Sequence, residues 1–366
     1  MKRTGPFIVI AEICAGFGVL GSIYAQTPQQ PETRIVLSEV VQSWKMPSPV
    51  FLGQLLCGQD GNIVGQFVTG PHLDSASIVA VGPETAPVIF DMGRVEKIEY
   101  PSLVNFDAFD GGVLMLLSGS RKSDFDGLTS PSKKALRGET VYVLARFSSK
   151  GELKESTVLD LPFTPAKAVA ISDQHLMILG SSKINAEPVM ALTDSSGTLL
   201  RYFDVPLPSL QQLIEQQSED PSNPIQPPAG SENLPTSNRV LGSLLSYSFA
   251  HHGDKLLLYR SRTAKLAKVL ELSDSGASRL VSLQLPPDKA LLSILPSDGG
   301  HWIAHAVSGD RVAPYLLDFD PEDGTLVTKL VTVNAPASTI LCEDHGKFYG
   351  YRSLEDGKTS LIEGQR

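Results

Sequence analysis

A weak internal repeat constrains this chain more than any other feature, because a regular period of about 40–50 residues is typical of repeat architectures. Six times along the sequence, an apolar segment leads to a short polar turn and a second apolar segment follows. Asp and Gly tolerate the positive φ of a tight turn, so each unit is predicted to begin with a β-hairpin. The six turns are Asp60-Gly61, Asp110-Gly111, Asp173-Gln174, His252-Gly253, Asp298-Gly299 and His345-Gly346.

Most units continue with two further apolar runs, which a second Gly-bearing turn separates. The fourth run ends near a proline, and proline suits a strand end or an outer edge because it cannot donate to a β-ladder. Four antiparallel strands per unit are the pattern of one propeller blade. The second turns are Lys150-Gly151, Ser196-Gly197, Ser275-Gly276 and Asp323-Gly324.

The spacing of the units supports this interpretation. The first residues of successive turns lie 50, 63, 79, 46 and 47 positions apart. The two long intervals hold insertions at about residues 120–138, rich in Ser, Lys, Asp and Gly, and at about 209–239, rich in Gln, Ser, Asn and Pro. Without the insertions both intervals approach about 45–48 residues, a normal blade length. Residues 218–238 are predicted to be disordered, since they offer little apolar surface to bury.

The two ends of the repeat region complement each other. The last unit has only three predicted strands, the third at residues 359–362, and residues 34–41 can supply the missing fourth. An N-terminal strand in the C-terminal blade would close the ring and hide the two edges that an open array leaves exposed. The predicted fold is therefore all-β, a six-bladed β-propeller over residues 33–366 that an N-terminal strand closes.

This pattern resembles the six-bladed β-propellers of secreted bacterial proteins, in the broad TolB-like or NHL-like group. The resemblance covers about residues 33–366, and the Trp-Asp ending of WD40 repeats is missing from every unit. It implies an architecture and leaves the function open.

Residues 1–25 have the pattern of an export signal. Lys2 and Arg3 precede an apolar run at 7–20, and Ala25 provides a small residue at a cleavage site before Gln26. Residues 26–32 are expected to form a flexible leader. The apolar run is nearly long enough for an uncleaved N-terminal anchor, which remains an alternative. We expect an exported protein, periplasmic or extracellular, with no membrane span in the mature chain.

The charge of the chain excludes one class of partner. The formal charge is -9, from 31 basic and 40 acidic residues, and loss of Lys2, Arg3 and Glu12 with the signal makes it -10. Nucleic-acid binding needs a surplus of Lys and Arg on some face, so no nucleic-acid partner is predicted. A basic or neutral partner is favoured.

The histidines do not have metal-ligand spacing. His301 and His305 belong to one predicted strand, where they would share a face about 13 Å apart, which is too far for one metal ion. We expect two polar residues on a half-exposed strand. His251, His252 and His345 lie in predicted turns and are expected to be solvated.

Cys57 and Cys342 occupy matching positions in the first and last units, which become neighbours when the ring closes. Matched central strands usually hold their Cα atoms farther apart than the roughly 7 Å that a disulfide allows. Buried free thiols are therefore expected. A disulfide, which an exported protein could retain, is the alternative.

No catalytic residue, metal site or cofactor is predicted. The Gly-x-Ser-x-Gly motif of serine nucleophiles is missing from the sequence, and so is a set of convergent metal ligands. The candidate axial binding residues are Asn105 and Asp107, on one face of the first strand of the second unit, and Lys167, at the start of the third.

The predicted function is a non-enzymatic binding or scaffolding module that holds a protein or small-molecule ligand at one face of the propeller. Two alternatives stay open. One is a propeller-type hydrolase or lyase with an axial calcium ion, and the other is an N-terminally anchored sensor domain.

Overall fold

The computed structural model divides the chain into two units, Met1–Gln30 and Pro31–Arg366, and the description below concerns the second. The predicted export signal, nearly all of the leader and most of the two insertions lie outside the described residues. The structure describes residues 32–39, 51–58, 62–69, 75–82, 86–109, 112–121, 140–206, 209, 212–213, 244–252, 254–261, 263–297, 300–308, 315–333, 339–344, 346–353 and 359–365.

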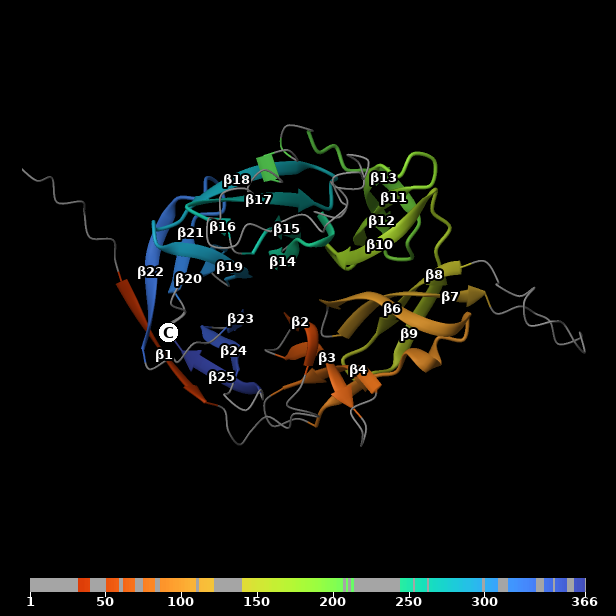
Figure 1. Cartoon of the computed structure of the whole chain (residues 1–366), viewed down its shortest axis with the longest axis horizontal. Coiled ribbons are helices and arrows are strands. Elements are labelled where there is room, and N and C mark those ends of the chain that lie inside the picture. The colour runs from red at the N-terminus through yellow and green to blue at the C-terminus, as the bar shows by residue number, and fades with distance from the viewer. Residues whose placement is uncertain are drawn as a thin grey trace, which may run out of the picture. The chain divides into compact units, whose positions relative to one another are not determined.

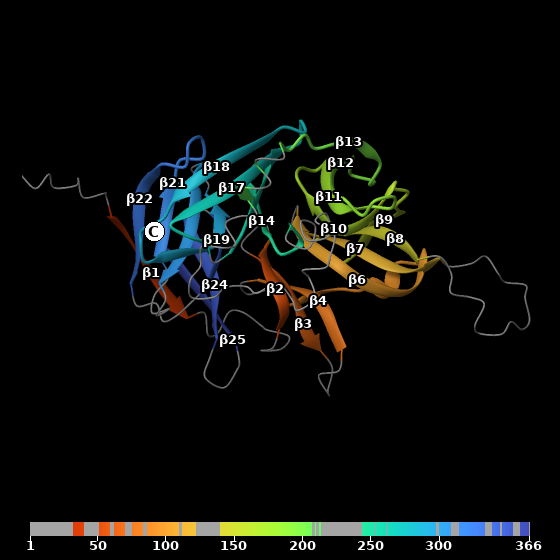
Figure 2. The same ribbon diagram turned by 45° about the horizontal axis from the view of Figure 1, so that its top comes forward.

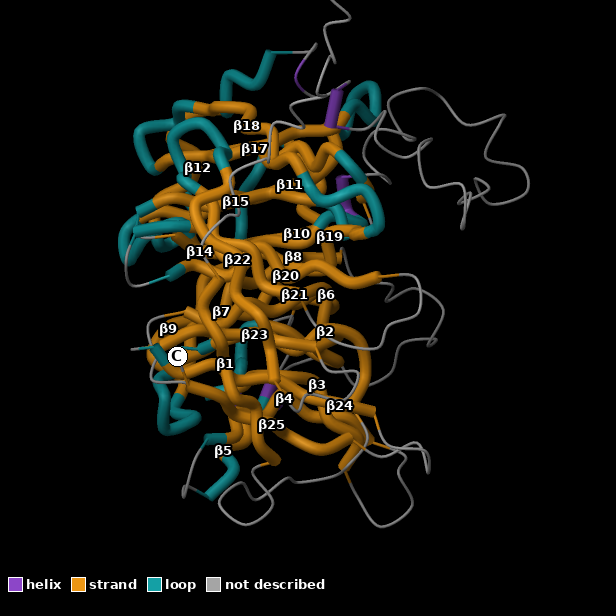
Figure 3. Tube along the Cα trace, turned by 90° about the vertical axis from the view of Figure 1, so that its left-hand side faces the viewer, coloured by secondary structure: helices purple, strands orange, loops and turns teal. Residues whose placement is uncertain are grey.

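The strands of Pro31–Arg366 form six antiparallel four-stranded blades, so the predicted six-bladed β-propeller is confirmed. The blades follow one another in chain order, and the first strand of each lies nearest the centre of the ring (Figure 1). Strands dominate the side view (Figure 3). Among the described residues, no helix is long and apolar enough to cross a membrane.

Blade 1 contains β2 (Phe51–Cys57), β3 (Ile63–Thr69), β4 (Ser75–Val81) and β5 (Val88–Phe90), and blade 2 contains β6 (Ile98–Phe109), β7 (Gly112–Arg121), β8 (Thr140–Phe147) and β9 (Leu153–Val158). Blade 3 contains β10 (Phe163–Ala170), β11 (His175–Ser182), β12 (Pro188–Asp194) and β13 (Leu199–Tyr202), and blade 4 contains β14 (Ser248–His252), β15 (Lys255–Tyr259), β17 (Leu266–Ser273) and β18 (Ser278–Gln284). Blade 5 contains β19 (Lys289–Pro296), β20 (Trp302–Ser308), β21 (Tyr315–Phe319) and β22 (Leu326–Val333), and blade 6 contains β23 (Thr339–Asp344), β24 (Lys347–Ser353), β25 (Thr359–Gln365) and β1 (Glu32–Glu39). A two-stranded contact also joins β16 (Thr263–Ala264) to β19.

In the predicted second turns, each glycine adopts the positive φ that such a turn requires. All four glycines have φ between +75° and +89°, a region that L-residues rarely adopt. Each turn joins the third and fourth strands of its blade. The four positions are Gly151, Gly197, Gly276 and Gly324.

The N-terminal strand closes blade 6 as predicted and also extends beyond it. The second half of β1 pairs antiparallel with β25, from Val36 opposite Gln365 to Glu39 opposite Ile362. Its first half pairs in parallel with β22 of blade 5, up to Val36 opposite Val333. Because a strand has two hydrogen-bonding edges, β1 joins blades 5 and 6 into one nine-stranded sheet. Figures 1 and 2 show β1 beside β22 and β25 at the rim.

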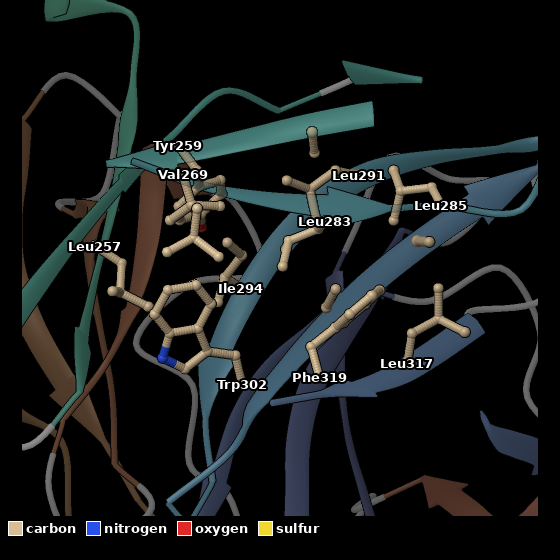
Figure 4. Packing of buried hydrophobic residues seen from close by; sticks show 14 of the residues in the cluster. Leu257, Tyr259, Val269, Leu283, Leu285, Leu291, Ile294, Trp302, Leu317 and Phe319 are labelled. Atoms are coloured by element: carbon tan, nitrogen blue, oxygen red, sulfur yellow. The ribbon is translucent and has the colours of Figure 1, made fainter. Parts of the chain in front are cut away.

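The core lies between the blades, and successive residues of a central strand face different neighbours. In β17, Val269 belongs to the cluster shared with blade 5, whereas Leu270 belongs to the cluster shared with blade 3. Trp302 and Phe319 are fully buried in the first of these clusters (Figure 4). Strands that are covered on both faces need nearly continuous apolar sequence, which explains the runs that define the repeat.

His305 is placed differently from the sequence expectation. It lies in β20 with an exposed fraction of 0%, so it is buried rather than on a half-exposed surface. Its Nδ1 accepts a hydrogen bond of 3.3 Å from the backbone N–H of Ile340 in blade 6. His301 precedes the strand, and its Nδ1 lies 3.0 Å from Oδ1 of Asp318. The correction for His305 has a physical cause: a blade interior is covered on both faces, so strand alternation does not expose every second residue.

The expectation of free thiols at Cys57 and Cys342 also differs from the structure. A disulfide joins them with a Cα–Cα distance of 5.3 Å, and it connects the first strands of blades 1 and 6 across 285 positions of sequence. Both strands change register against their partners, β2 between Leu52 and Leu55 and β23 between Ile340 and Cys342. Such bulges bend a strand and redirect its side chains, which the ideal strand spacing did not anticipate.

Candidate functional site

Asn105 and Asp107 lie in β6 and bond to the backbone of the next blade. The amide of Asn105 donates from Nδ2 to the carbonyl of Ala168 and accepts at Oδ1 from the N–H of Ala168, both at 2.9 Å. Oδ2 of Asp107 accepts from the N–H of Ala170 at 2.9 Å. The predicted alternation that places both side chains on one face is correct, and that face lies against β10.

His251 completes this group, although the sequence placed it in a turn. It is the fourth residue of β14, and its Nε2 lies 3.2 Å from Oδ2 and 3.3 Å from Oδ1 of Asp107. Burial by itself lowers the pKa of His251, but the charge of Asp107 and its hydrogen bond outweigh burial and raise the pKa above the ordinary value. The available signal was the order of the repeat, which makes residues 248–252 the first strand of blade 4.

Lys167 in β10 points to blade 4. Its Nζ donates to the carbonyl of Tyr247 at 3.1 Å and lies 4.2 Å from the centre of the Phe249 ring. Burial lowers the pKa of Lys167 to about 8, against the opposing effect of the Asp107 charge. The cation is thus held by a carbonyl and an aromatic face.

The three candidate axial residues therefore connect blades 2, 3 and 4 to one another. Among the described residues, no group of three or more His, Cys, Asp or Glu side chains is placed to hold a metal ion. An axial calcium ion bound by Asn105 and Asp107 would have to compete with the backbone groups of Ala168 and Ala170 that these side chains now bond.

A cavity of about 320 Å³ lies beside this polar group, between blades 2 and 3. Its walls come from the strand ends at the β6–β7 and β8–β9 turns of blade 2 and from the last residue of β10 in blade 3. Most of the lining is apolar, with two cationic side chains and two serines. The lining residues are Phe109, Val113, Leu114, Arg146, Phe147, Ser148, Ser149, Lys154 and Ala170.

The cavity and the polar group share residues. Phe109 lines the cavity, and the centre of its ring lies 5.6 Å from that of His251. Ala170 also lines it, and its N–H is the donor to Asp107. The bonds between blades 2 and 3 therefore fix the position of one wall against the other.

The two cations of the lining differ in their surroundings. Lys154 is exposed and forms an ion pair of 3.0 Å with Glu152. Arg146 is partly buried, and its Nε and Nη2 are buried with no hydrogen-bond partner among the residues that the structure describes. Buried N–H groups are nearly always bonded in proteins, so the guanidinium of Arg146 is the unusual group of this site. No motif in the sequence marks Arg146, which lies within an ordinary strand pattern.

Comparisons with known proteins do not assign this chain to a family. No family model matches the chain, and no curated protein matches its sequence. Among solved structures, "YCF48 bound to D1 peptide" matches with 8% identity and a TM-score of 0.40, over 93% of this chain and 85% of that one. A protein of unknown function from Bacteroides caccae matches with 11% identity and a TM-score of 0.34, over 82% and 83% of the two chains.

The structure of a prolyl endopeptidase also matches, with 14% identity and a TM-score of 0.37 over 85% of this chain. The chain spans only 39% of the length of that peptidase. At these identities and TM-scores the three similarities give no information on activity or ligand. The architecture of this chain rests on its own strand pairing, and that pairing identifies it as a six-bladed β-propeller.

Proposed function

We propose that this protein is a binding module whose ligand occupies the cavity between blades 2 and 3. The observation that carries the proposal is the lining, which combines a mostly apolar surface with the partly buried guanidinium of Arg146. Ligand sites are commonly concave and apolar, with a few placed polar groups that orient the ligand.

The neighbouring hydrogen bonds suit this role. A binding site keeps its shape when its walls belong to rigid elements and when further contacts hold those elements together. Asn105 and Asp107 bond β6 to β10, and these two strands carry Phe109 and Ala170, which both line the cavity. The turns around the cavity are displayed on this frame, which is how many binding proteins present their ligand-contacting loops.

The proposal includes export to the periplasm or the exterior, as in the secreted TolB-like or NHL-like propellers. Two observations support it, namely the signal-like pattern of residues 1–25 and the disulfide between Cys57 and Cys342. Disulfides persist in oxidising compartments. If residues 1–25 stay attached, the same cavity would serve an anchored sensor rather than a free binding protein.

A fluorine NMR screen of small fragments tests the proposal. Ser149 is an exposed turn residue that lines the cavity, so Ser149→Trp should cover its entrance without changing the core. Ser275→Trp, in the exposed turn between the third and fourth strands of blade 4, is the matched control. Fragments that bind the natural protein should bind Ser275→Trp equally and Ser149→Trp at least about tenfold more weakly. Equal binding to all three proteins, or no binding fragment at all, would contradict the proposal.

A further inference from the structure

We infer that blades 2 and 3 carry a docking surface for a protein segment that combines apolar side chains with Lys or Arg. The surface is an exposed apolar patch, which consists of Tyr100, Ile184 and Tyr202. It lies at the end of the ring opposite the cavity, so the inference goes beyond the proposed ligand site and does not depend on it.

The two ends of a blade carry different connections. The turns that join the first strand to the second and the third to the fourth lie at one end, and the cavity is at that end. The turns between the second and third strands, and the connections between blades, lie at the other end. Tyr100 is near the start of β6, Ile184 is in the turn between β11 and β12, and Tyr202 ends β13. All three therefore lie at this second end, on two blades that are neighbours in Figures 1 and 2.

Two members of the patch lie close to Phe163, the buried first residue of β10. The centre of the Tyr202 ring is 6.4 Å from that of Phe163. Phe163 also pairs with Ser182 across the β10–β11 ladder, and Ile184 follows Ser182 by two positions. The aromatic ring of Tyr202 and the side chain of Ile184 thus belong to the same corner of blade 3.

The third member comes from blade 2 at nearly the same level. β6 and β10 run side by side in the same direction, because the side chain of Asn105 bonds to the backbone of Ala168. Tyr100 precedes Asn105 by five positions, and Phe163 precedes Ala168 by five positions. The patch therefore extends across the boundary between blades 2 and 3.

The patch is unusually exposed for its composition. The exposed fractions are 87% for Tyr100, 97% for Ile184 and 52% for Tyr202. Single exposed apolar residues are normal on a protein surface. Several that lie together mark an interaction site, and Tyr is among the residues that contribute most to binding in interfaces.

The turn that carries Ile184 is held by hydrogen bonds. The N–H of Ile184 donates to Oγ of Ser182 at 3.2 Å, and the N–H of Ala186 donates to the carbonyl of Ser182 at 3.0 Å. Nζ of Lys183 donates to the carbonyl of Leu161 at 2.9 Å. A side chain displayed on a rigid turn loses less conformational freedom when a partner binds.

Tyr100 has a strained backbone. Its φ is +53°, which is uncommon for a bulky L-residue, and Pro101 further disfavours helical conformations at the position before it. Such strain is frequent at functional sites, where the surrounding structure maintains it. Here the strained position presents an exposed aromatic ring at the edge of the patch.

The charges around the patch determine the chemistry of the partner. Lys97 and Lys183 donate from Nζ to the backbone carbonyls of Ser156 and Leu161. Four exposed acidic side chains at this end of blades 2 and 3 form no ion pair with any residue that the structure describes. They are Glu96, Glu99, Asp160 and Glu187. Acidic groups around an apolar centre complement a segment with apolar residues beside Lys or Arg.

Selection from a displayed library of random peptides tests the docking surface. The natural protein should select peptides that combine apolar residues with Lys or Arg, and binding of the synthetic peptides is measured by fluorescence anisotropy. Tyr100→Asn and Ile184→Ser should each weaken binding at least about tenfold. Added salt should also weaken binding, because it screens the exposed acids.

Leu200→Ser is the matched control, since Leu200 is 51% exposed in β13 but lies outside the patch, and it should leave peptide binding unchanged. Thermal unfolding checks that the variants fold. The melting temperature of Tyr100→Asn should stay the same or rise, because Asn accepts a positive φ more readily than Tyr. A loss of binding without a loss of stability would identify Tyr100 as a contact residue.

The outcomes separate the docking surface from the cavity. Peptides that lose binding in Ser149→Trp but not in Tyr100→Asn or Ile184→Ser would support the cavity and overturn the docking surface. The absence of any selected peptide, or peptides without Lys or Arg, would also overturn it. Self-association in sedimentation velocity that Tyr100→Asn abolishes would assign the patch to a second copy of the chain instead. Binding to phosphatidylcholine vesicles that the same variant abolishes would assign it to a membrane.

Discussion

The amide side chain of Asn105 bonds in both directions to the backbone of Ala168, donating to its carbonyl and accepting from its N–H at 2.9 Å each. Asn105 follows a register shift between β6 and β7. A bulge redirects the side chain that follows it, here toward the first strand of the next blade. One local irregularity in blade 2 thereby supplies a bond between two blades.

The same arrangement recurs around the ring. Five of the first strands, β2, β6, β10, β19 and β23, change register against the second strand of their blade. In blades 3, 5 and 6 the residue after the shift also reaches the next blade. The contacts are Lys167 to the carbonyl of Tyr247, Ser293 to the carbonyl of Ile340, and Cys342 to Cys57.

Replacing Asn105 should measure what one such contact contributes. Asn105→Ala leaves the N–H and carbonyl of Ala168 without their partner, and we expect a loss of about 1–3 kcal/mol in the free energy of unfolding. Chemical denaturation checks this value. Asn185→Ala is the control, because Asn185 lies in an exposed turn and accepts one bond of 3.3 Å from Glu187. That variant should change stability by no more than about 0.5 kcal/mol.

The pair of His251 and Asp107 should make stability depend on pH. The folded state raises the pKa of His251, so the pair stabilises the protein below the ordinary histidine pKa of about 6.5 and loses this effect as pH rises through the folded value. The difference in unfolding free energy between the natural protein and His251→Gln should therefore be larger at pH 5.5 than at pH 8.5. A difference that stays constant, or that grows with pH, would show that His251 is not charged beside Asp107.

His305 should make the stability of the protein depend on pH in the direction opposite to that of His251. Burial lowers its pKa to about 4, so the neutral side chain stabilises the fold above pH 6.5 and this contribution is lost as pH falls toward 4. The shift corresponds to as much as about 3 kcal/mol at low pH. His305→Gln retains an acceptor for Ile340 but does not titrate, and its unfolding transition in acid should lie at lower pH than that of the natural protein. A transition at the same pH in both proteins would contradict the prediction.

The disulfide should be detectable by mass spectrometry after alkylation and by its contribution to the free energy of unfolding. Protein isolated without reductant should show no alkylation of Cys57 or Cys342 after denaturation, and reduction should make both reactive. A bond that closes so long a loop restricts the unfolded chain, so we expect Cys57→Ala with Cys342→Ala to lose about 2–5 kcal/mol. The variant should still fold, because β1 also holds blade 6 through β25. Free thiols in the unreduced protein would contradict the prediction.

The sequence by itself determined the number of blades, the antiparallel hairpins and the closure of blade 6 by a strand near residues 34–41. These features depend on local properties, namely apolar runs of strand length and turns whose Gly residues accept positive φ. The sequence between the first two units marks no such boundary, and the structure separates β4 from the short β5 there.

Only the tertiary structure decided the pairing of β1 with β22, the disulfide, the burial of His305 and the cavity beside Arg146. Each depends on how close two blades come, and the residues involved lie far apart in sequence, 63 positions for Asn105 and Ala168 and 144 for Asp107 and His251. Strand periodicity assigns a side chain to a face of its own blade. Bulges and the approach of the next blade determine what that side chain meets.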